Sequence, residues 1–223
     1  MTSLPRRLLA EALGTAILLA VVVGSGIMAD RLAGGNDAIA LLANALATGC
    51  ALFVLILMFC PVSGAHFNPA VSVAMALKGT LGRQDAVAYI VVQLAGALAG
   101  VAIAHVMFDL PLFTASTHAR DGMGQVLSEF VATFGLLLTI LMVGRQGVMA
   151  TALAVGCFIT AGYWFTASTS FANPAVSLAR AFSDTFAGIR IDGVPWFVLA
   201  QLCAVPIAIG VEKLLTTPQM PKA

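Results

Sequence analysis

The chain contains unusually few charged residues. Only 9% of its 223 residues are charged, whereas a soluble globular domain carries about 25%. The hydrophobic share is 60%, and the mean hydropathy is +1.00. This composition excludes an ordinary soluble domain, and a formal net charge of +1 gives no reason to expect a nucleic-acid partner. We therefore expect an integral membrane protein with several spans.

Cysteine is also scarce, and its four copies form no recognisable cluster. Cys50, Cys60, Cys157 and Cys203 fall within or at the ends of apolar segments, without a CxxC or Cys/His pattern. This spacing argues against a metal site or a disulfide and favours small buried apolar residues. The apolar segments also offer no nucleophile–base pair, so we expect no catalytic residues, no metal and no cofactor.

Apolar segments of about 20 residues, long enough to cross the hydrocarbon core, recur along the whole chain. They cover approximately residues 8–29, 38–60, 85–108, 123–143, 148–166 and 194–216. The first is too long for a signal peptide and has no cleavage signature after it, so we interpret it as a retained span. Segments 61–78 and 167–184 each hold a polar loop and about three apolar turns, which are too short to cross. We expect both to be re-entrant half-helices.

One short motif occurs once in each of these half-helices. Residues 68–72 and 173–177 both read Asn-Pro-Ala-Val-Ser. Asn is a favoured N-cap and Pro suits the first helical turn, so each Asn-Pro step predicts a helix start. Non-helical backbone at membrane depth is tolerated only where it is buried in protein or lines a cavity. Two such starts, one in each half, therefore predict a pore.

The two halves of the chain repeat the same elements in the same order. Glu11 and Glu129 lie in the first span of each half, and each is followed by the Asn-Pro-Ala motif and then by a Gln in the third span. Because each half has three spans, the second half enters the membrane from the opposite side. We therefore expect one channel domain over 1–223, built from inverted repeats of about 1–115 and 116–223.

Two of the carboxylates, Glu11 and Glu129, lie inside predicted spans, where an unpaired charge is costly. One explanation is a proton relay in a coupled transporter. The other is that each carboxylate accepts N–H hydrogen bonds from its own re-entrant loop. The symmetrical placement of the pair favours the structural role.

Basic residues are distributed unequally between the two sides of the predicted bundle. If the N-terminus is inside, the outer loops hold Arg31, Arg120, Arg180 and Arg190. The cytoplasmic segments then hold Arg6, Arg7, Lys78, Arg83, Arg145, Lys213 and Lys222. The excess of basic residues on the inner side predicts cytoplasmic N- and C-termini by the positive-inside rule.

Residues 63–71, which read SGAHFNPAV, occur together with a second Asn-Pro-Ala and two Glu-containing spans. This combination resembles the aquaporin (major intrinsic protein) family over essentially the whole chain. The resemblance implies an all-α membrane protein with six transmembrane helices plus two re-entrant half-helices in an inverted repeat. It implies one pore per subunit, a homotetramer in the lipid bilayer and a channel rather than an enzyme. It also agrees with Glu11 and Glu129 as loop-bracing carboxylates.

The doubled motif assigns the centre of the pore, where both Asn amides offer N–H donors to a passing solute. The motif residues are Asn68, Pro69, Ala70, Asn173, Pro174 and Ala175. The non-helical residues before each Asn are expected to line the path and to present carbonyl acceptors. These residues are Gly64, Ala65, His66, Ser170, Phe171 and Ala172. The positive ends of two half-helix dipoles meet at the centre and oppose cations and protons.

The residue after the second Asn-Pro-Ala departs from the family pattern. Most members carry Arg there, whereas this chain carries Val176. The missing guanidinium removes a fixed positive charge and several donors, and its absence widens the passage. By spacing from the motifs, the other selectivity-filter positions are Thr48, Ala161 and Ser170, and a shift of one residue would select Gly162 instead of Ala161. This set contains no aromatic ring, so we expect a wide, uncharged and mildly polar filter.

Arg180 follows Val176 by one helical turn and can lie on the same face. It can restore positive charge near the outer mouth. Basic side chains near helix ends more often extend to the membrane interface, and we expect that arrangement here.

The NPAV second motif with small filter residues resembles the bacterial branch of the family that is associated with arsenic resistance. This resemblance implies a bacterial inner-membrane channel for small neutral solutes, including arsenite as arsenous acid, glycerol-like polyols and water. Ser177 and Ala181 match the water-channel pattern instead, so a water-selective aquaporin is one alternative, with Arg180 replacing the missing arginine. A non-conducting structural membrane protein is another.

Overall fold

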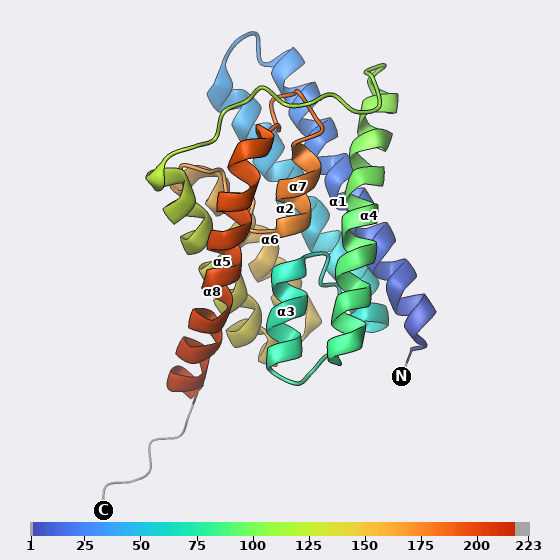
Figure 1. The fold of residues 1–223 in the computed structure, drawn as a ribbon, viewed down its shortest axis with the longest axis vertical. Coiled ribbons are helices and arrows are strands. Elements are labelled where there is room, and N and C mark those ends of the chain that lie inside the picture. The colour runs from blue at the N-terminus through green and yellow to red at the C-terminus, as the bar shows by residue number, and fades with distance from the viewer. Residues whose placement is uncertain (1, 217–223) are drawn as a thin grey trace, which may run out of the picture.

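The computed structural model describes residues 2–216, and within this range the chain is entirely helical apart from its loops. Six helices surround two short ones (Figure 1). The long helices are α1 (Leu4–Leu32), α2 (Asp37–Ser63), α4 (Arg83–Met107), α5 (Met123–Val143), α6 (Val148–Phe165) and α8 (Val194–Thr216). Each is long and apolar enough to cross a membrane. The predicted fold class is therefore confirmed.

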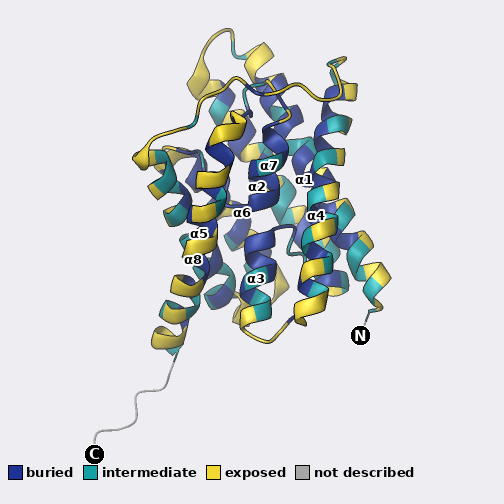
Figure 2. Cartoon of the chain, in the orientation of Figure 1, coloured by how far each residue is buried: buried dark blue, intermediate teal, exposed yellow. Residues whose placement is uncertain are grey.

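The two short helices, α3 (Pro69–Leu77) and α7 (Pro174–Arg180), lie inside the ring of long ones. They extend from the middle of the molecule toward opposite ends (Figure 1). Figure 2 shows that α7 is buried along its length, as is the start of α3. Single 3-10 turns, η1 (Gly144–Gln146) and η2 (Ile191–Gly193), precede α6 and α8.

The first re-entrant segment begins later than the sequence suggests. Helix α2 continues through Pro61 and ends at Ser63, where Gly64 adopts a left-handed φ of 91°. A proline in the last turn costs only one backbone hydrogen bond, and glycine enters the left-handed region without a Cβ clash. The non-helical part of the segment is therefore confined to residues 64–68.

Glycines allow α1 and α4 to approach closely. A Cβ atom at Gly100 would overlap the carbonyl oxygen of Ala16 and would lie 2.8 Å from the Cβ of Leu19. Small residues are enriched at such helix interfaces because they permit close backbone packing within a membrane. This packing holds α1, and with it Glu11, at a fixed depth against α4.

We expect Gly100→Ala to destabilise the protein by about 1–3 kcal/mol, because the added methyl forces α1 and α4 apart. Thermal unfolding in detergent measures the effect. Gly124→Ala is the matched control, since a Cβ there meets no atom within 4 Å. Equal melting temperatures for the two variants would show that the close approach is unimportant for stability.

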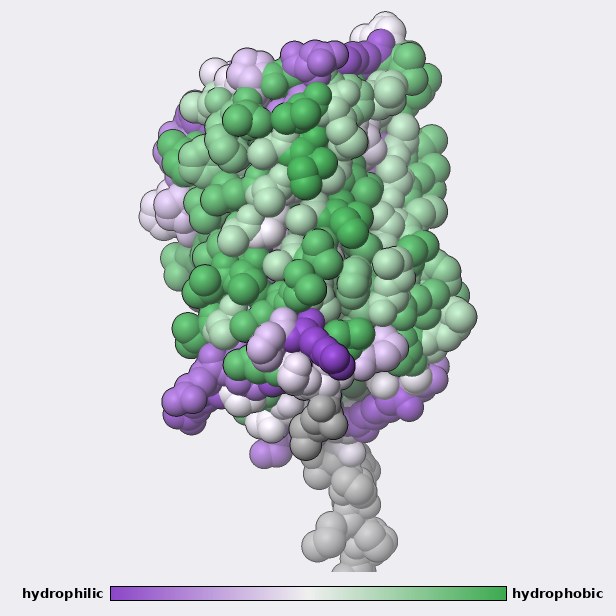
Figure 3. Space-filling view, turned by 90° about the vertical axis from the view of Figure 1, so that its right-hand side faces the viewer, coloured by the Kyte–Doolittle hydropathy of each residue, from purple (hydrophilic) through white to green (hydrophobic). Residues whose placement is uncertain are grey.

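The outer surface is apolar between two polar ends. Figure 3 shows a broad hydrophobic band on one face, with hydrophilic residues above and below it.

Cys50, Cys157 and Cys203 are exposed on the outer surface, so the expectation that they are buried is wrong; only Cys60 is partly covered. The start of α1 and the end of α8 lie at the same end of the molecule (Figure 1). Lys222, used above to predict orientation, lies outside the described residues.

Candidate functional site

A cavity of about 620 Å³ runs through the middle of the bundle. Both loops that precede the short helices line it, together with α2, α5 and α6. One end is lined by Arg7 and Arg145, and the other end reaches Arg180. Asn68 and Asn173 both line the cavity, as expected from the sequence. The other motif residues, Pro69, Ala70, Pro174 and Ala175, are buried and do not line it.

The two Asn side chains connect the halves of the structure. The side-chain oxygen of Asn68 accepts from the N–H of Ala70 at 2.9 Å, and that of Asn173 accepts from Ala175 at 2.9 Å. Each oxygen therefore caps its own helix. The amide nitrogens donate across the centre, with Asn68 bonded to the carbonyl of Ala172 at 2.7 Å. One N–H of each amide is used in this way, and the second remains for the cavity.

The reciprocal bond runs from the Asn173 amide to the carbonyl of Phe67 at 2.8 Å. Ala172 lines the cavity as expected, and its carbonyl already accepts one hydrogen bond from Asn68. Among residues 2–216, the carbonyls of Gly64, Ala65, His66, Ser170 and Phe171 accept no hydrogen bond. All five residues line the cavity, so acceptors are present on both sides of the Asn pair.

The loop backbones are held in an unfavourable conformation. Ala65 and Phe67 have positive φ angles of 52° and 49°, and Ser170 and Ala172 have φ angles of 54° and 48°. Left-handed backbone is uncommon for residues with a Cβ and costs about 1–3 kcal/mol each where it is strained. Such a conformation persists only when the surroundings hold it in place.

Glu11 holds the first loop. Its Oε1 accepts from the Ser63 hydroxyl at 2.6 Å and from the His66 N–H at 3.0 Å. Its Oε2 accepts from the Phe67 N–H at 2.7 Å and from the Gln93 side chain at 2.8 Å. The carboxylate is fully buried, and each of its oxygens has two donors. This arrangement leaves no free acceptor for a proton relay.

Glu129 holds the second loop in the equivalent way. Its oxygens accept from the N–H groups of Phe171 at 2.9 Å and Ala172 at 2.8 Å. The side chain of Gln201 donates to it at 2.6 Å and to the Ser177 hydroxyl at 2.9 Å. The repeat order identified the Gln in each half, but its role as a partner of the carboxylate is visible only in the structure.

His66 lies on the cavity wall in the half that opens toward Arg7. Its Nδ1 lies 3.0 Å from the Ser72 hydroxyl, and its ring packs edge-on against Tyr89 with centroids 5.3 Å apart. The ring is therefore oriented by two neighbours. His66 therefore lines the path, as expected from the sequence.

Three of the expected filter positions belong to the wall of the cavity. Thr48, Ser170 and Val176 line it, and each is at most 5% exposed. Ala161 does not line the cavity and is exposed on the outer face of α6. Gly162 instead faces Ser170, because a Cβ at Gly162 would lie 2.6 Å from the Ser170 hydroxyl. The assignment of Ala161 is thus wrong by one residue, which is about 100° around a helix.

An aromatic side chain that the motif spacing does not select also lies here. Tyr163 lines the cavity, and its hydroxyl is 3.1 Å from the hydroxyl of Thr48. Phe171 also lines the cavity, and its ring lies against the guanidinium of Arg180. The spacing from the motifs predicts a filter without aromatic rings. The structure shows that the outer end of the cavity contains at least one, that of Tyr163. Tyr163 was missed because it follows Gly162 on α6 and belongs to no recognisable motif.

Arg180 does not extend to the membrane interface. It is only 2% exposed, lines the cavity and donates from Nε to the carbonyl of Ala187. The expectation failed because α7 is enclosed by other helices, so the side chain has no lipid interface within reach.

Ion pairs surround the opposite mouth. Glu212 is 4% exposed and pairs with Lys78 at 2.7 Å and with Arg145 at 2.5 Å, which joins the end of α3, η1 and α8. Arg7 pairs with Asp85 at 2.6 Å between α1 and α4. These contacts fix the helix ends around the opening. Among the described residues no group of His, Cys, Asp or Glu is arranged to hold a metal ion.

Comparisons with known proteins agree with this geometry. The sequence pattern of the family described as "Major intrinsic protein" matches residues 1–147. Aquaglyceroporin AqpS of Rhizobium meliloti (strain 1021) is 55% identical over 218 residues, which cover 98% of this chain and 93% of that protein. A glycerol uptake facilitator protein of Streptococcus pneumoniae is 30% identical, with 91% and 94% of the two chains covered.

The fold has also been seen in a crystal. The X-ray structure of the aquaglyceroporin from Plasmodium falciparum superposes with a TM-score of 0.77 at 24% identity, and 96% of this chain and 98% of that chain are covered. The match shares the arrangement of helices. With the family pattern covering well over half of the sequence and a relative at 55% identity, the chain belongs to the major intrinsic protein family.

Proposed function

We propose that this protein is a passive membrane channel for small neutral solutes, including glycerol-like polyols as well as water. The observation that carries the proposal is the continuous cavity, which passes both Asn side chains and has Val176 at the position of the family arginine. The names of the two relatives above, an aquaglyceroporin and a glycerol uptake facilitator, agree with a passage wider than a water-selective one.

The polar groups along the cavity suit a hydroxylated solute. The second N–H of each Asn amide is a donor at the centre, and unpaired loop carbonyls are acceptors on either side. Apolar side chains such as Val71 and Leu52 form much of the remaining wall. A polyol can exchange its water for these groups one hydroxyl at a time, whereas an ion loses its hydration without a counter-charge.

We assign the selectivity filter to Thr48, Gly162, Ser170 and Val176. The side chains of this set are small, and none carries a charge. Arsenous acid, a compact neutral trihydroxide, offers hydrogen-bonding groups similar to those of glycerol, and we propose it as a further substrate. The water-selective alternative is favoured by one observation, because Arg180 and Tyr163 both reach the outer end of the cavity.

We further propose one channel domain of two inverted repeats, at about 1–115 and 116–223, in a bacterial inner membrane. The bonds of Glu11 and Glu129 to their loops support the repeat. Both described chain ends lie on the same side, and the positive-inside rule makes that side cytoplasmic. The family resemblance supports a homotetramer, in which neighbouring subunits and lipid would cover the exposed apolar faces.

Flux measurements on reconstituted liposomes test the proposal. A hyperosmotic glycerol gradient should cause rapid shrinkage followed by reswelling, as glycerol enters through the channel. Arsenic uptake from neutral arsenous acid should likewise exceed that of protein-free liposomes. Rapid shrinkage without reswelling would instead identify a water-selective channel. Rates equal to those of protein-free liposomes for every solute would identify a non-conducting structural protein.

A further inference from the structure

The outer end of the cavity contains a guanidinium without a carboxylate partner. Among residues 2–216, Arg180 forms no ion pair, and the carbonyl of Ala187 is its only hydrogen-bond acceptor, through Nε. The terminal nitrogens are not sealed in the protein, since neither is a buried atom without a partner. Because Arg180 lines the cavity, these donors face the path of a solute.

A second arginine lies beside the first. The guanidinium carbon of Arg180 is 3.4 Å from the centroid of the Phe171 ring, and that of Arg120 is 5.2 Å from the same centroid. Phe171 is held in turn by an edge-on contact with Phe197 at 5.2 Å. Two cations therefore share one aromatic ring. The ring attracts each cation, while the two like charges repel each other.

Arg120 is placed by the long connection between α4 and α5, which crosses the outer end of the bundle (Figure 1). Its Nε donates to the carbonyl of Gly188 at 2.8 Å. Its terminal nitrogens donate to the carbonyls of Ser168 and Phe186, each at 3.4 Å. All three are backbone acceptors, and among residues 2–216 Arg120 forms no ion pair. The buried carboxylate of Glu129 acts on Arg120 and Arg180 only through space.

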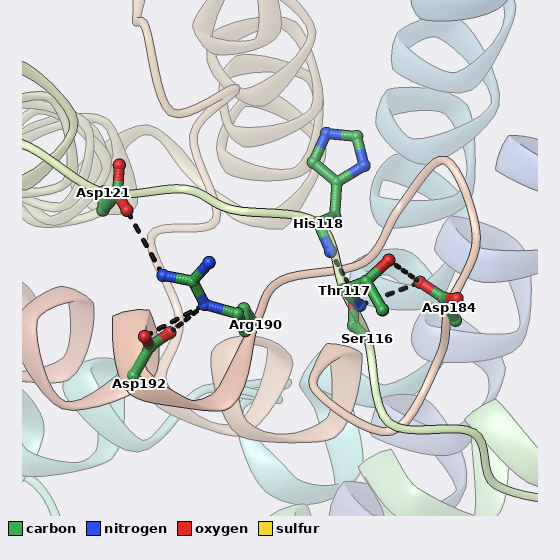
Figure 4. Close-up of polar contacts among 7 residues, drawn as sticks. All are labelled: Ser116, Thr117, His118, Asp121, Asp184, Arg190 and Asp192. Atoms are coloured by element: carbon green, nitrogen blue, oxygen red, sulfur yellow. Dashed lines mark hydrogen bonds and ion pairs between the residues drawn. The ribbon is translucent and has the colours of Figure 1, made fainter.

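The connection is tied down on both sides of Arg120. Figure 4 shows Thr117 bonded to Asp184, with its N–H and hydroxyl at 2.9 and 3.0 Å from one carboxylate oxygen. The same view shows Arg190 paired with Asp121 at 3.4 Å. The backbone N–H of Arg190 also donates to the carbonyl of His118 at 2.8 Å. These contacts join the connection to the loop between α7 and α8.

The positive charge extends to the surface above the mouth. The pKa of His118 is lowered, first by burial and then by the charges of Arg120 and Arg180, against a smaller opposite effect of Asp184. The carboxylates of Asp121 and Asp184 are engaged with Arg190 and Thr117 rather than with either arginine of the mouth.

We propose that Arg180, with Arg120 behind it, forms a cationic outer constriction one helical turn outside Val176. Solutes are then selected by charge at Arg180 rather than at position 176, where most family members carry arginine. The filter around Val176 stays wide and uncharged. Neutral solutes and anions reach Val176 more readily than cations do. This inference rests on the proposed function, because it assigns the charge selectivity of the same conducting path.

Charged thiol reagents measure the potential at the filter directly. The test protein carries Val176→Cys as the reactive thiol at the filter. It also carries Cys60→Ser, because Cys60 is the only described cysteine that lines the cavity and would otherwise react as well. The reagents are anionic sulfonatoethyl and cationic aminoethyl methanethiosulfonate, each normalised to neutral methyl methanethiosulfonate. We expect the anion-to-cation rate ratio to fall at least about 10-fold on Arg180→Gln, because a unit charge one helical turn from position 176 is removed. Arg120→Gln should lower the ratio by less.

Matched variants separate charge from folding. Arg180→Lys keeps the charge and should keep the ratio, even if the contact with Phe171 weakens. Arg31→Gln is the control, since Arg31 also stacks on a ring at the outer end, that of Phe108, but lies away from the cavity. Size-exclusion chromatography checks that each variant assembles.

The inference is overturned if Arg180→Gln, like the control Arg31→Gln, leaves the anion-to-cation rate ratio of the Val176→Cys, Cys60→Ser protein unchanged. If Arg180→Gln does not assemble, Arg180→Lys and Arg120→Gln still decide it. The constriction is supported if Arg180→Lys keeps the anion-to-cation rate ratio and Arg120→Gln lowers it. It is overturned if Arg120→Gln leaves the ratio unchanged or if Arg180→Lys abolishes it. Glycerol flux of the unaltered protein is measured separately, so failure of the proposed function is recognised independently of the labelling result.

Discussion

Val176→Arg is expected to lower glycerol permeability at least about 10-fold, which corresponds to about 1.4 kcal/mol in the barrier. A guanidinium at this position would enter a region already bounded by Thr48, Tyr163 and Ser170. It would narrow the passage and would add a second fixed positive charge beside Arg180. Water is smaller and should lose much less permeability. Stopped-flow light scattering on proteoliposomes measures both solutes on the same preparation.

Val176→Met separates size from charge in this experiment. Its side chain is longer than valine but carries no charge, so it should lower glycerol permeability by less than the arginine does. If Val176→Arg conducts glycerol as well as the unaltered protein, Val176 does not set the width of the filter. The proposed function would then lose its principal support.

Glu129→Gln is expected to lower the free energy of unfolding by roughly 2–4 kcal/mol and to reduce flux. The N–H of Phe171 donates to one carboxylate oxygen and that of Ala172 to the other. A glutamine has only one oxygen, so its NH₂ group must face one of these donors. The loop would then lose an acceptor while its left-handed residues still need support.

Thermal unfolding in detergent should show this loss as a fall of about 5–15 °C in melting temperature. Glu11→Gln should lower the melting temperature similarly, because the Glu11 oxygens accept hydrogen bonds from the backbone N–H groups of His66 and Phe67. Asp37→Asn is the control, as its carboxylate is exposed at the start of α2. A melting temperature for Glu129→Gln that equals the control would contradict a bracing role.

The features predicted well from the sequence depend on residues close together in the chain. Each Asn-Pro step contains its own helix-start signal, and in the structure Asn68 and Asn173 cap α3 and α7. The long apolar segments correspond to the six long helices. Short-range capping bonds and the length needed to cross a bilayer can both be predicted without knowledge of tertiary contacts.

The errors concern helix phase and enclosure. Spacing along the chain predicts Ala161 instead of Gly162, because it places a residue only to within about one position and each position turns a helix by about 100°. Arg180 was expected at an interface because basic residues near helix ends usually lie beside lipid headgroups. The motif predicts that the start of α7 is enclosed, but no local pattern shows that its last turn, with Arg180, is enclosed as well.

The sequence alone was sufficient for the family, the six spans, the paired half-helices and the missing arginine at Val176. The arrangement of the outer mouth required the three-dimensional structure, because Arg120 and Phe171 are about 50 residues apart and meet only when a long connection crosses the bundle. Such meetings depend on loop closure and packing between distant segments, which leave no local pattern. Local signals thus define a pore, while long-range contacts place its charge.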